Sequence, residues 1–167
     1  MAVELATLDD LDRLVELWVA LAAEQREHGS HLTAEPNRDL MREALAQHVV
    51  DHTCLVARED ANEDAETASI VGFVSFDLEQ DGLDRDVTRG VVQNLYVGPD
   101  ARNRGLGSEL LDAAEDALEA AGAERIVLDA MAANEAGRRF YEAQGYQAHR
   151  ITYQRATGDG KDTKEKG

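Results

Sequence analysis

The sequence predicts one α/β domain in which helices cover a mixed β-sheet. Short segments rich in β-branched residues alternate along the chain with longer segments whose apolar residues recur at helical spacing. The chain has 167 residues, the size of one ordinary domain, which buries roughly 70% of the surface that its unfolded form exposes. Hydrophobic residues make up 43% of the composition, enough for a packed core.

The first half of the chain predicts a short strand, two helices and an antiparallel meander. Thr7 can cap the first helix because Asp10 follows three residues later, and Pro36 precedes the second. The acidic connection from Glu59 to Thr67 and the Asp81-Gly82 turn separate the strands of the meander. The expected elements are a strand over Val3–Ala6, helices from Thr7 to about Gln25 and over Arg38–Val50, and strands over Thr53–Arg58, Ser69–Leu78 and Thr88–Val97.

The second half alternates helix and strand. Gly122 and Gly145 stop the two helices. We expect a helix over Arg104–Ala121, a strand over Arg125–Ala130, a helix over Asn134–Gln144 and a last strand over Tyr146–Arg155. The resulting order is β-α-α-β-β-β-α-β-α-β. The unit from residue 88 to residue 130 should form a right-handed crossover, which gives the sheet a central pair of parallel strands. The expected domain is therefore residues 1–155, followed by a polar, disordered tail over 156–167.

The chain is strongly acidic, with 34 Asp and Glu against 17 Lys and Arg, a net charge of −17 and a pI near 4.5. Lysine occurs only as Lys161, Lys164 and Lys166. This balance argues against general nucleic-acid binding, which needs clustered basic residues. It favours a halophilic, archaeal source, because molar salt screens the repulsion between carboxylates. A GC-rich genome would explain the arginines but not the excess of acids.

Further classes are excluded by what the sequence lacks. There is no apolar run near the ~20 residues of a membrane helix and no secretory leader after Met1, so we expect a cytoplasmic protein without membrane contact. Cys54 is the single cysteine, which excludes an intrachain disulfide. His48, His52 and Cys54 approach the spacing of metal ligands, but packing explains these three residues better, so no metal is expected.

The segment from Gly98 to Ser108 joins a predicted strand to a predicted helix. Free amides at the start of a helix attract anions, and glycines let a phosphate approach the backbone. Arg102 and Arg104 add positive charge there, so an anionic ligand is indicated. A P-loop is excluded because the Gly-Lys-Ser/Thr ending is missing. A dinucleotide fingerprint needs Gly or Ala where Leu110 stands, and a simple turn with solvated arginines is the remaining alternative.

Two motifs resemble those of the GNAT superfamily of N-acetyltransferases. The first is Leu95-Tyr96-Val97 followed by Pro99 and Arg102-x-x-Gly105-x-Gly107, which is similar to the superfamily's acetyl-CoA motif. The second comprises Leu128, Asn134, Gly137 and Phe140-Tyr141-Glu142-x-x-Gly145-Tyr146. The order of elements also matches. The resemblance covers residues 3–155 and implies a GNAT-like fold with acetyl-CoA as co-substrate.

The resemblance also implies where the co-substrate binds. The main chain of the strand end would pair with the pantetheine arm like an added strand, and a strand amide near Val97 would polarise the thioester carbonyl. Amides from Asn103 to Ser108 would hold the pyrophosphate, and Asn134 would bind near the pantetheine. The implied binding residues are Leu95, Tyr96, Val97, Arg102, Asn103, Arg104, Gly105, Leu106, Gly107, Ser108 and Asn134.

Acetylation of an amine needs a base for the amine proton and benefits from an acid for the departing thiolate. The resemblance places Tyr141 beside the thioester sulfur, where its hydroxyl can serve as the acid. Many superfamily members carry a carboxylate where this chain has Gln93 and Asn94, neither of which can act as a base. Asp129 follows the leucine of the fifth strand and is one candidate for the base; a chain of waters to bulk solvent is the other.

The function implied is acetyl transfer from acetyl-CoA to a primary amine by direct transfer. The acceptor can be a small molecule, a lysine or a protein N-terminus. The sequence is also compatible with a homodimer. The alternative from another class is a catalytically silent module that binds CoA or acyl-CoA. The absence of a carboxylate at Gln93 favours this alternative, whereas Tyr141 favours the enzyme.

Overall fold

A computed structural model describes residues 2–59 and 69–158, and the chain forms two units, Met1–Glu135 and Ala136–Gly167. The acidic connection expected up to residue 67 and the tail from residue 159 onward lie outside the described residues. The elements in chain order are β1 (Ala2–Leu5), η1 (Leu8–Asp10), α1 (Leu11–Glu27), η2 (Glu35–Asn37), α2 (Arg38–Val50), β2 (Cys54–Glu59), β3 (Ser69–Leu78), β4 (Arg89–Val97), η4 (Pro99–Ala101), α3 (Leu106–Ala120), β5 (Arg125–Val127) and α4 (Glu135–Ala143).

The five strands of the first unit form one sheet in the order β1-β2-β3-β4-β5. β1 to β4 pair with their neighbours in antiparallel fashion, which confirms the predicted meander. β4 and β5 are parallel and are joined through α3, which confirms the predicted crossover. Among the described residues β5 is the outermost strand, so the parallel pair lies at one side of the sheet.

β4 and β5 pair only over a short stretch. Their register runs from Arg89 opposite Arg125 to Val91 opposite Val127, whereas β4 continues to Val97. The β3–β4 register shifts between Ser75 and Phe76, and this bulge leaves Gln93 as the additional residue of β4. From residue 92 to residue 97, no described strand pairs with β4 on the side of β5. That edge of β4 therefore has no strand partner among the described residues.

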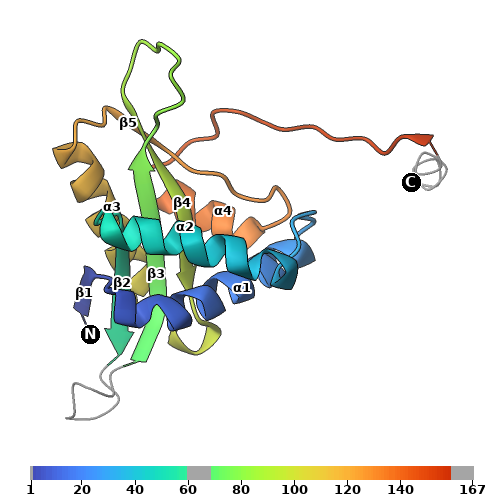
Figure 1. Cartoon of the computed structure of the whole chain (residues 1–167). Helices are drawn as coiled ribbons and strands as arrows, with labels where there is room; N and C mark the ends of the chain where they lie inside the picture. Colours follow the sequence, from blue (N-terminus) through green and yellow to red (C-terminus); the bar gives the residue numbers. More distant parts are fainter. Residues whose placement is uncertain (1, 60–68, 159–167) are drawn as a thin grey trace. The chain divides into compact units, whose positions relative to one another are not determined.

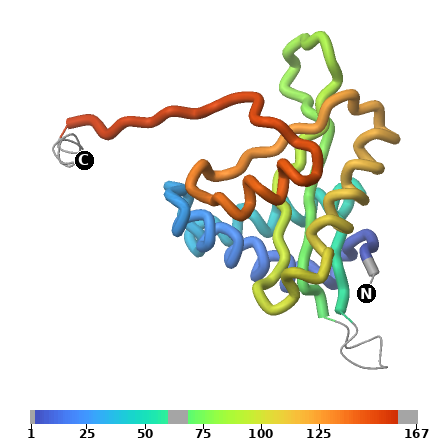
Figure 2. The backbone as a smooth tube through the Cα atoms, turned by 180° about the vertical axis from the view of Figure 1, so that it is seen from behind, coloured from blue at the N-terminus to red at the C-terminus, as the bar shows by residue number. Residues whose placement is uncertain are grey.

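Helices cover both faces of this sheet: α1 and α2 lie on one face and α3 on the other, as Figures 1 and 2 show from opposite sides. α1 and α2 bury Leu14, Trp18 and Leu45 in a cluster with Phe73 and Tyr96 of the sheet. The buried residues of α3 are Leu106, Leu110, Leu111, Ala114 and Leu118. They follow the helical period of the sequence, so the predicted amphipathic stripe is the packed face.

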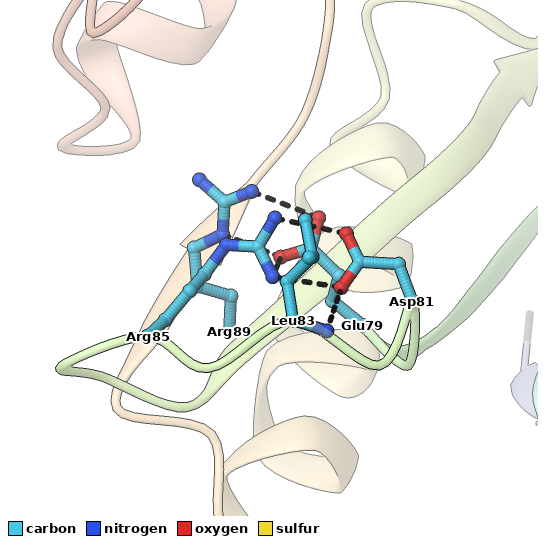
Figure 3. A network of polar contacts seen from close by, with 5 residues as sticks. All are labelled: Glu79, Asp81, Leu83, Arg85 and Arg89. Atoms are coloured by element: carbon cyan, nitrogen blue, oxygen red, sulfur yellow. Dashed lines mark hydrogen bonds and ion pairs between the residues drawn. The ribbon is translucent and has the colours of Figure 1, made fainter.

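The β3–β4 hairpin carries a network of charged side chains (Figure 3). Arg89 of β4 donates two hydrogen bonds of 2.8 Å to the carboxylate of Glu79. Arg85 bonds both oxygens of Asp81 at 3.0 and 2.9 Å and lies 3.1 Å from Glu79. The hydrogen bond from Arg85 and the amide of Leu83 hold the pKa of Asp81 well below its ordinary value. The loop is thus closed by charge-assisted bonds at the end of the sheet where β4 begins.

Two predictions about strands are wrong. Residues 146–157 contain neither helix nor strand, whereas a last strand was expected over Tyr146–Arg155, and β5 ends at Val127 instead of Ala130. Side chains 147–158 are exposed. A strand is stabilised by a neighbouring ladder and a buried face, so a favourable composition alone does not form one.

Candidate functional site

The turn between β4 and α3 contains two residues with left-handed backbone conformation. After η4, Asn103 has φ +65° and Gly105 has φ +82°. Asn and Gly are the residues that adopt this conformation most readily. A side chain at Gly105 would meet no atom within 4 Å, so the backbone there faces open space. The glycine serves the turn's conformation and leaves its surface accessible.

The same turn presents unpaired amide groups. Within the described residues, no main-chain N–H from Asn103 to Ser108 donates a hydrogen bond, and the first helical bond of α3 runs from the Glu109 amide to the Gly105 carbonyl at 3.0 Å. The positive end of the α3 dipole lies at this point. Turns of this kind with left-handed residues form concave sites for anions. The arrangement therefore fits a phosphate group.

The two arginines of the turn are already engaged within the chain. Arg102 donates to the Val97 carbonyl at 2.8 Å, pairs with Glu24 of α1 at 2.6 Å and lies 5.4 Å from the centroid of the Tyr96 ring. Arg104 pairs with Glu59 and donates to the Asp100 carbonyl at 3.1 Å. The sequence suggested a free positive spot, but carboxylates neutralise both charges. The amides, not the arginines, are the groups left open for an anion.

The strand residues of the first motif form the unpaired end of β4. Leu95 and Val97 are half-buried, and Val97 packs toward α3 beside Gly72 and Leu110. Tyr96 is buried on the opposite face, and burial raises the pKa of its hydroxyl to about 12. These side chains fix the strand from both faces, while no described strand pairs with its outer backbone edge, where Arg102 bonds the Val97 carbonyl. That edge meets the requirement for binding an extended chain by strand addition.

Asp129 and Asn134 lie in the irregular segment between β5 and α4. Asp129 is exposed, and no hydrogen bond or ion pair orients its carboxylate among the described contacts. Asn134 immediately precedes α4, and its amide donates to the Met131 carbonyl at 2.9 Å. Met131 reaches to 4.0 Å from the Cβ position of Gly29, so this segment lies against the loop that follows α1.

Tyr141 lies on α4 in the second unit. Its ring makes edge contacts with Phe140 at 5.3 Å and with Tyr146 at 6.1 Å between centroids. Gly145 (φ +96°) ends the helix as predicted, and the Tyr146 amide bonds the Tyr141 carbonyl at 3.0 Å. Burial raises the pKa of Tyr141 above its ordinary value of 10. The hydroxyl therefore keeps its proton at neutral pH.

His48 of α2 makes a polar contact that the sequence did not reveal. Its Nδ1 lies 2.7 Å from the Thr53 hydroxyl, and the side chain of Gln93, at the bulge of β4, acts on the pKa of its ring. Burial lowers the pKa of His48 below 6.5, although Asp77, Asp51 and Gln93 act in the opposite direction. The sequence alone favours packing as the explanation of His48. Only the bulge and the register, which sequence patterns do not specify, bring it to Gln93.

No group of three or more His, Cys, Asp or Glu side chains that could hold a metal ion occurs in residues 2–59 and 69–158. Cys54 is fully buried in the core, and burial raises the pKa of its thiol to about 12. Across the same residues, no helix has the length and apolar character needed to span a membrane.

Comparison with known proteins places these features in a family. A sequence profile of the acetyltransferase (GNAT) family matches residues 12–146. Mycothiol acetyltransferase of Propionibacterium freudenreichii subsp. shermanii is 36% identical over 140 residues, which are 83% of this chain and 40% of that protein. The chain therefore spans well under half the length of that curated relative.

Solved structures share the fold. The tetramutant of the BH1408 protein from Bacillus halodurans superposes with a TM-score of 0.78 at 20% identity, covering 94% of this chain and all of the other. Ribosomal-protein-alanine N-acetyltransferase from Brucella melitensis biovar Abortus 2308 gives a TM-score of 0.61 at 26% identity, covering 93% and 98%. The chain belongs to the acetyltransferase (GNAT) family, whose acetyl donor is acetyl-CoA.

Proposed function

We propose that this chain transfers the acetyl group of acetyl-CoA directly to a primary amine. The observation that carries the proposal is the row of unbonded amides from Asn103 to Ser108 at the start of α3, beside the unpaired edge of β4. A phosphate-bearing arm fits the first feature, and an extended amide-containing arm fits the second. Pantetheine pyrophosphate combines both.

In this mechanism, groups of the protein bind acetyl-CoA, orient it and move protons. The backbone of Leu95 to Val97 would pair with the pantetheine arm, Asn134 would bind beside it, and a strand amide near Val97 would polarise the thioester carbonyl. The amine nitrogen attacks that carbonyl carbon, the C–S bond breaks, and the sulfur receives the proton of the Tyr141 hydroxyl. The amine proton moves either to Asp129 or through a chain of waters to solvent, the two alternatives that the sequence leaves open.

The acceptor class remains a small primary amine, a lysine or a protein N-terminus. The name of the mycothiol acetyltransferase relative supports a small molecule, whereas that of the ribosomal-protein-alanine enzyme supports an N-terminus. The experiment is acetyl-CoA consumption in molar KCl against three kinds of acceptor. These are small primary amines, a peptide with a free N-terminal alanine, and a lysine peptide with a blocked N-terminus.

Binding and turnover are measured separately, because the second candidate is a silent CoA-binding module. Gly107→Glu should abolish acetyl-CoA binding in calorimetry while the circular dichroism spectrum stays unchanged, since it adds bulk and negative charge at the amides. Unchanged affinity in this variant contradicts the proposed binding site. Binding by the wild type without turnover on any acceptor supports the silent module, which Gln93 favours by lacking a carboxylate.

A further inference from the structure

The segment after α4 is extended, yet it joins no sheet among the described residues. From Tyr146 to Thr157 the backbone contains no helix, strand, turn or bend, and Figures 1 and 2 show a long extended chain. At about 3.3 Å per residue, this stretch reaches about 40 Å. Ile151 and Tyr153, two positions apart, are 66% and 87% exposed. A segment of β-forming residues with exposed apolar side chains at this spacing fits the edge of a sheet.

β5 is an edge strand whose apolar side chains are incompletely covered. It is the outermost strand of the described sheet, and its register with β4 ends at Val127. Residues 126–128 are only half-buried, whereas Phe73 and Val74 of the central β3 are fully buried. Native proteins usually cover such an edge, because an exposed apolar edge binds further strands. β5 can therefore accept one more strand on the side away from β4.

The charges at the two ends of β5 match those of the extended segment. Glu124 and Asp129 flank the strand and are both exposed. Residues 143–158 contain no Asp or Glu, although the chain has 34 of them, and they include Arg150 and Arg155. The two acids are five positions apart, and so are the two arginines. A parallel or an antiparallel alignment of the two segments can therefore pair both charges.

The apolar residues decide between these two directions. The antiparallel alignment that pairs the charges sets Ile151 opposite Leu128. It also sets Tyr153 opposite Ile126 on the same face, because both residues are two positions further along. Such cross-strand apolar pairs stabilise a sheet. The parallel alignment would instead set Ile151 against the charged side chain of Arg125, so the antiparallel register is favoured.

An added strand at β5 would also explain why two expected strands differ from the structure. β5 ends at Val127 instead of Ala130, and the strand expected over Tyr146–Arg155 does not form in the single chain. Both segments lack the neighbouring ladder that stabilises a strand. Pairing the segment of one copy with β5 of another would supply that ladder to both. Asp129, which no described hydrogen bond or ion pair orients, would gain an arginine as its partner.

We propose that two copies of this chain exchange their C-terminal segments, so that residues 150–155 of each copy pair in antiparallel fashion with residues 124–129 of the other. The exchange is reciprocal, so it closes a two-fold symmetric dimer instead of building an open filament. It does not depend on the proposed acetyl transfer. The partner of the exposed segment is thus a second copy of the same chain.

The first test measures the mass of the full chain in solution. Sedimentation equilibrium in molar KCl should give twice 18.3 kDa. Ile151→Asp should raise the Kd of the dimer by ~10-fold or more, because a carboxylate would then lie beside Leu128 in both exchanged strands. Thr157→Asp adds the same charge beyond the paired residues and should leave the Kd unchanged. A monomeric wild type, or equal effects of the two variants, overturns the proposal.

A cross-link distinguishes exchange between copies from pairing within one chain. In Ile126→Cys/Tyr153→Cys, the new thiols belong to directly opposed residues, at a Cα separation that a disulfide can bridge. Oxidation of the native protein should give a covalent dimer in a denaturing gel without reductant. Ile126→Cys/Thr157→Cys is the matched control and should stay monomeric, and Cys54 is fully buried. A disulfide closed within one chain, no disulfide, or a covalent dimer of the control as well overturns the proposal.

Discussion

At the scale of single residues, Arg102 ties the turn between β4 and α3 to its neighbours. Its guanidinium joins the carbonyl of Val97, the carboxylate of Glu24 and the ring of Tyr96. These contacts connect α1, the end of β4 and the turn through one side chain. A motif residue that seems suited to touch phosphate thus has a complete set of partners inside the protein. Its observed contacts hold the turn in place.

Removal of the Tyr141 hydroxyl tests its proposed role as the acid that protonates the departing thiolate. Tyr141→Phe should lower kcat by ~10²-fold or more because the departing thiolate loses its proton donor. The affinity for acetyl-CoA should survive, since the ring and its contacts with Phe140 and Tyr146 remain. Single-turnover kinetics with the best acceptor measure the effect, and Tyr153→Phe is the control because Tyr153 is exposed. Wild-type turnover with chemistry rate-limiting would exclude Tyr141 as the acid.

The lowered pKa of Asp10 predicts how the free energy of unfolding depends on pH. Burial raises its pKa, but hydrogen bonds from Arg58 at 2.7 Å and from the Thr7 amide at 2.8 Å outweigh burial and lower the value below 3.8. A depressed native pKa adds stability above the unfolded pKa, and this stability is lost as the pH falls through the native value. Asp10→Asn should therefore lower the free energy of unfolding by about 1–3 kcal/mol at pH 7, and the deficit should shrink toward pH 3. Urea titrations at both pH values measure the difference, and a constant deficit would contradict it.

Residue types and spacing pointed to the turn as a candidate, because backbone sites need glycines in a fixed order, and the resemblance to the GNAT superfamily added Asn134 and Tyr141. They could not reveal that Glu24 and Glu59 neutralise the two arginines, since those carboxylates are distant in sequence. The same holds for His48. Gln93, which acts on the pKa of its ring, lies 45 positions along the chain at a bulge in the β3–β4 ladder.

At the scale of elements, the main functional feature is the parting of β4 from β5 after three residue pairs. A longer β5 would satisfy the edge of β4 and leave no place for an added chain. The helices and the meander were predictable because each has a continuous apolar period of its own. The expected last strand was wrong because alternation over Tyr146–Arg155 specifies no partner.

Substitutions of Gly105 test how much the left-handed backbone conformation of the turn contributes to stability. Its φ of +82° is strained for a residue with a Cβ, although no neighbouring atom would clash with one. Gly105→Ala should therefore lower the free energy of unfolding by about 1–2 kcal/mol, and Gly105→Asn should lower it by less. Denaturant titrations of the two variants distinguish conformational strain from lost packing. Equal stability of all three proteins would show that the backbone relaxes there.

At the scale of the whole molecule, charge is the dominant property. The arginines of the hairpin in Figure 3 and those of the turn are all bonded to carboxylates, yet acids outnumber bases by 34 to 17. Acidic residues therefore exceed basic residues by 17, and these like charges repel one another at neutral pH. Such repulsion favours an expanded chain unless ions screen it.

Salt should consequently stabilise the fold. Diluting the protein from about 1 M KCl, where the Debye length is about 3 Å, to about 0.1 M, where it is about 10 Å, should lower the melting temperature. Repulsion between carboxylates then extends further in the compact state. Differential scanning fluorimetry across a KCl series measures the shift, with sucrose as a control for general exclusion effects. A flat or rising melting temperature on dilution would favour genome composition as the cause of the acidity.

The burial of Cys54 has a practical consequence for measuring catalysis. Its side chain is fully enclosed, and its raised pKa keeps the sulfur as the unreactive thiol. Acetyl transfer liberates CoA, which carries a free thiol. A chromogenic disulfide reagent will therefore react with the CoA product and not with Cys54 while the protein stays folded. The same reagent in denaturant will count one additional sulfhydryl per chain. A single optical signal can thereby follow turnover in the native protein and report its unfolding.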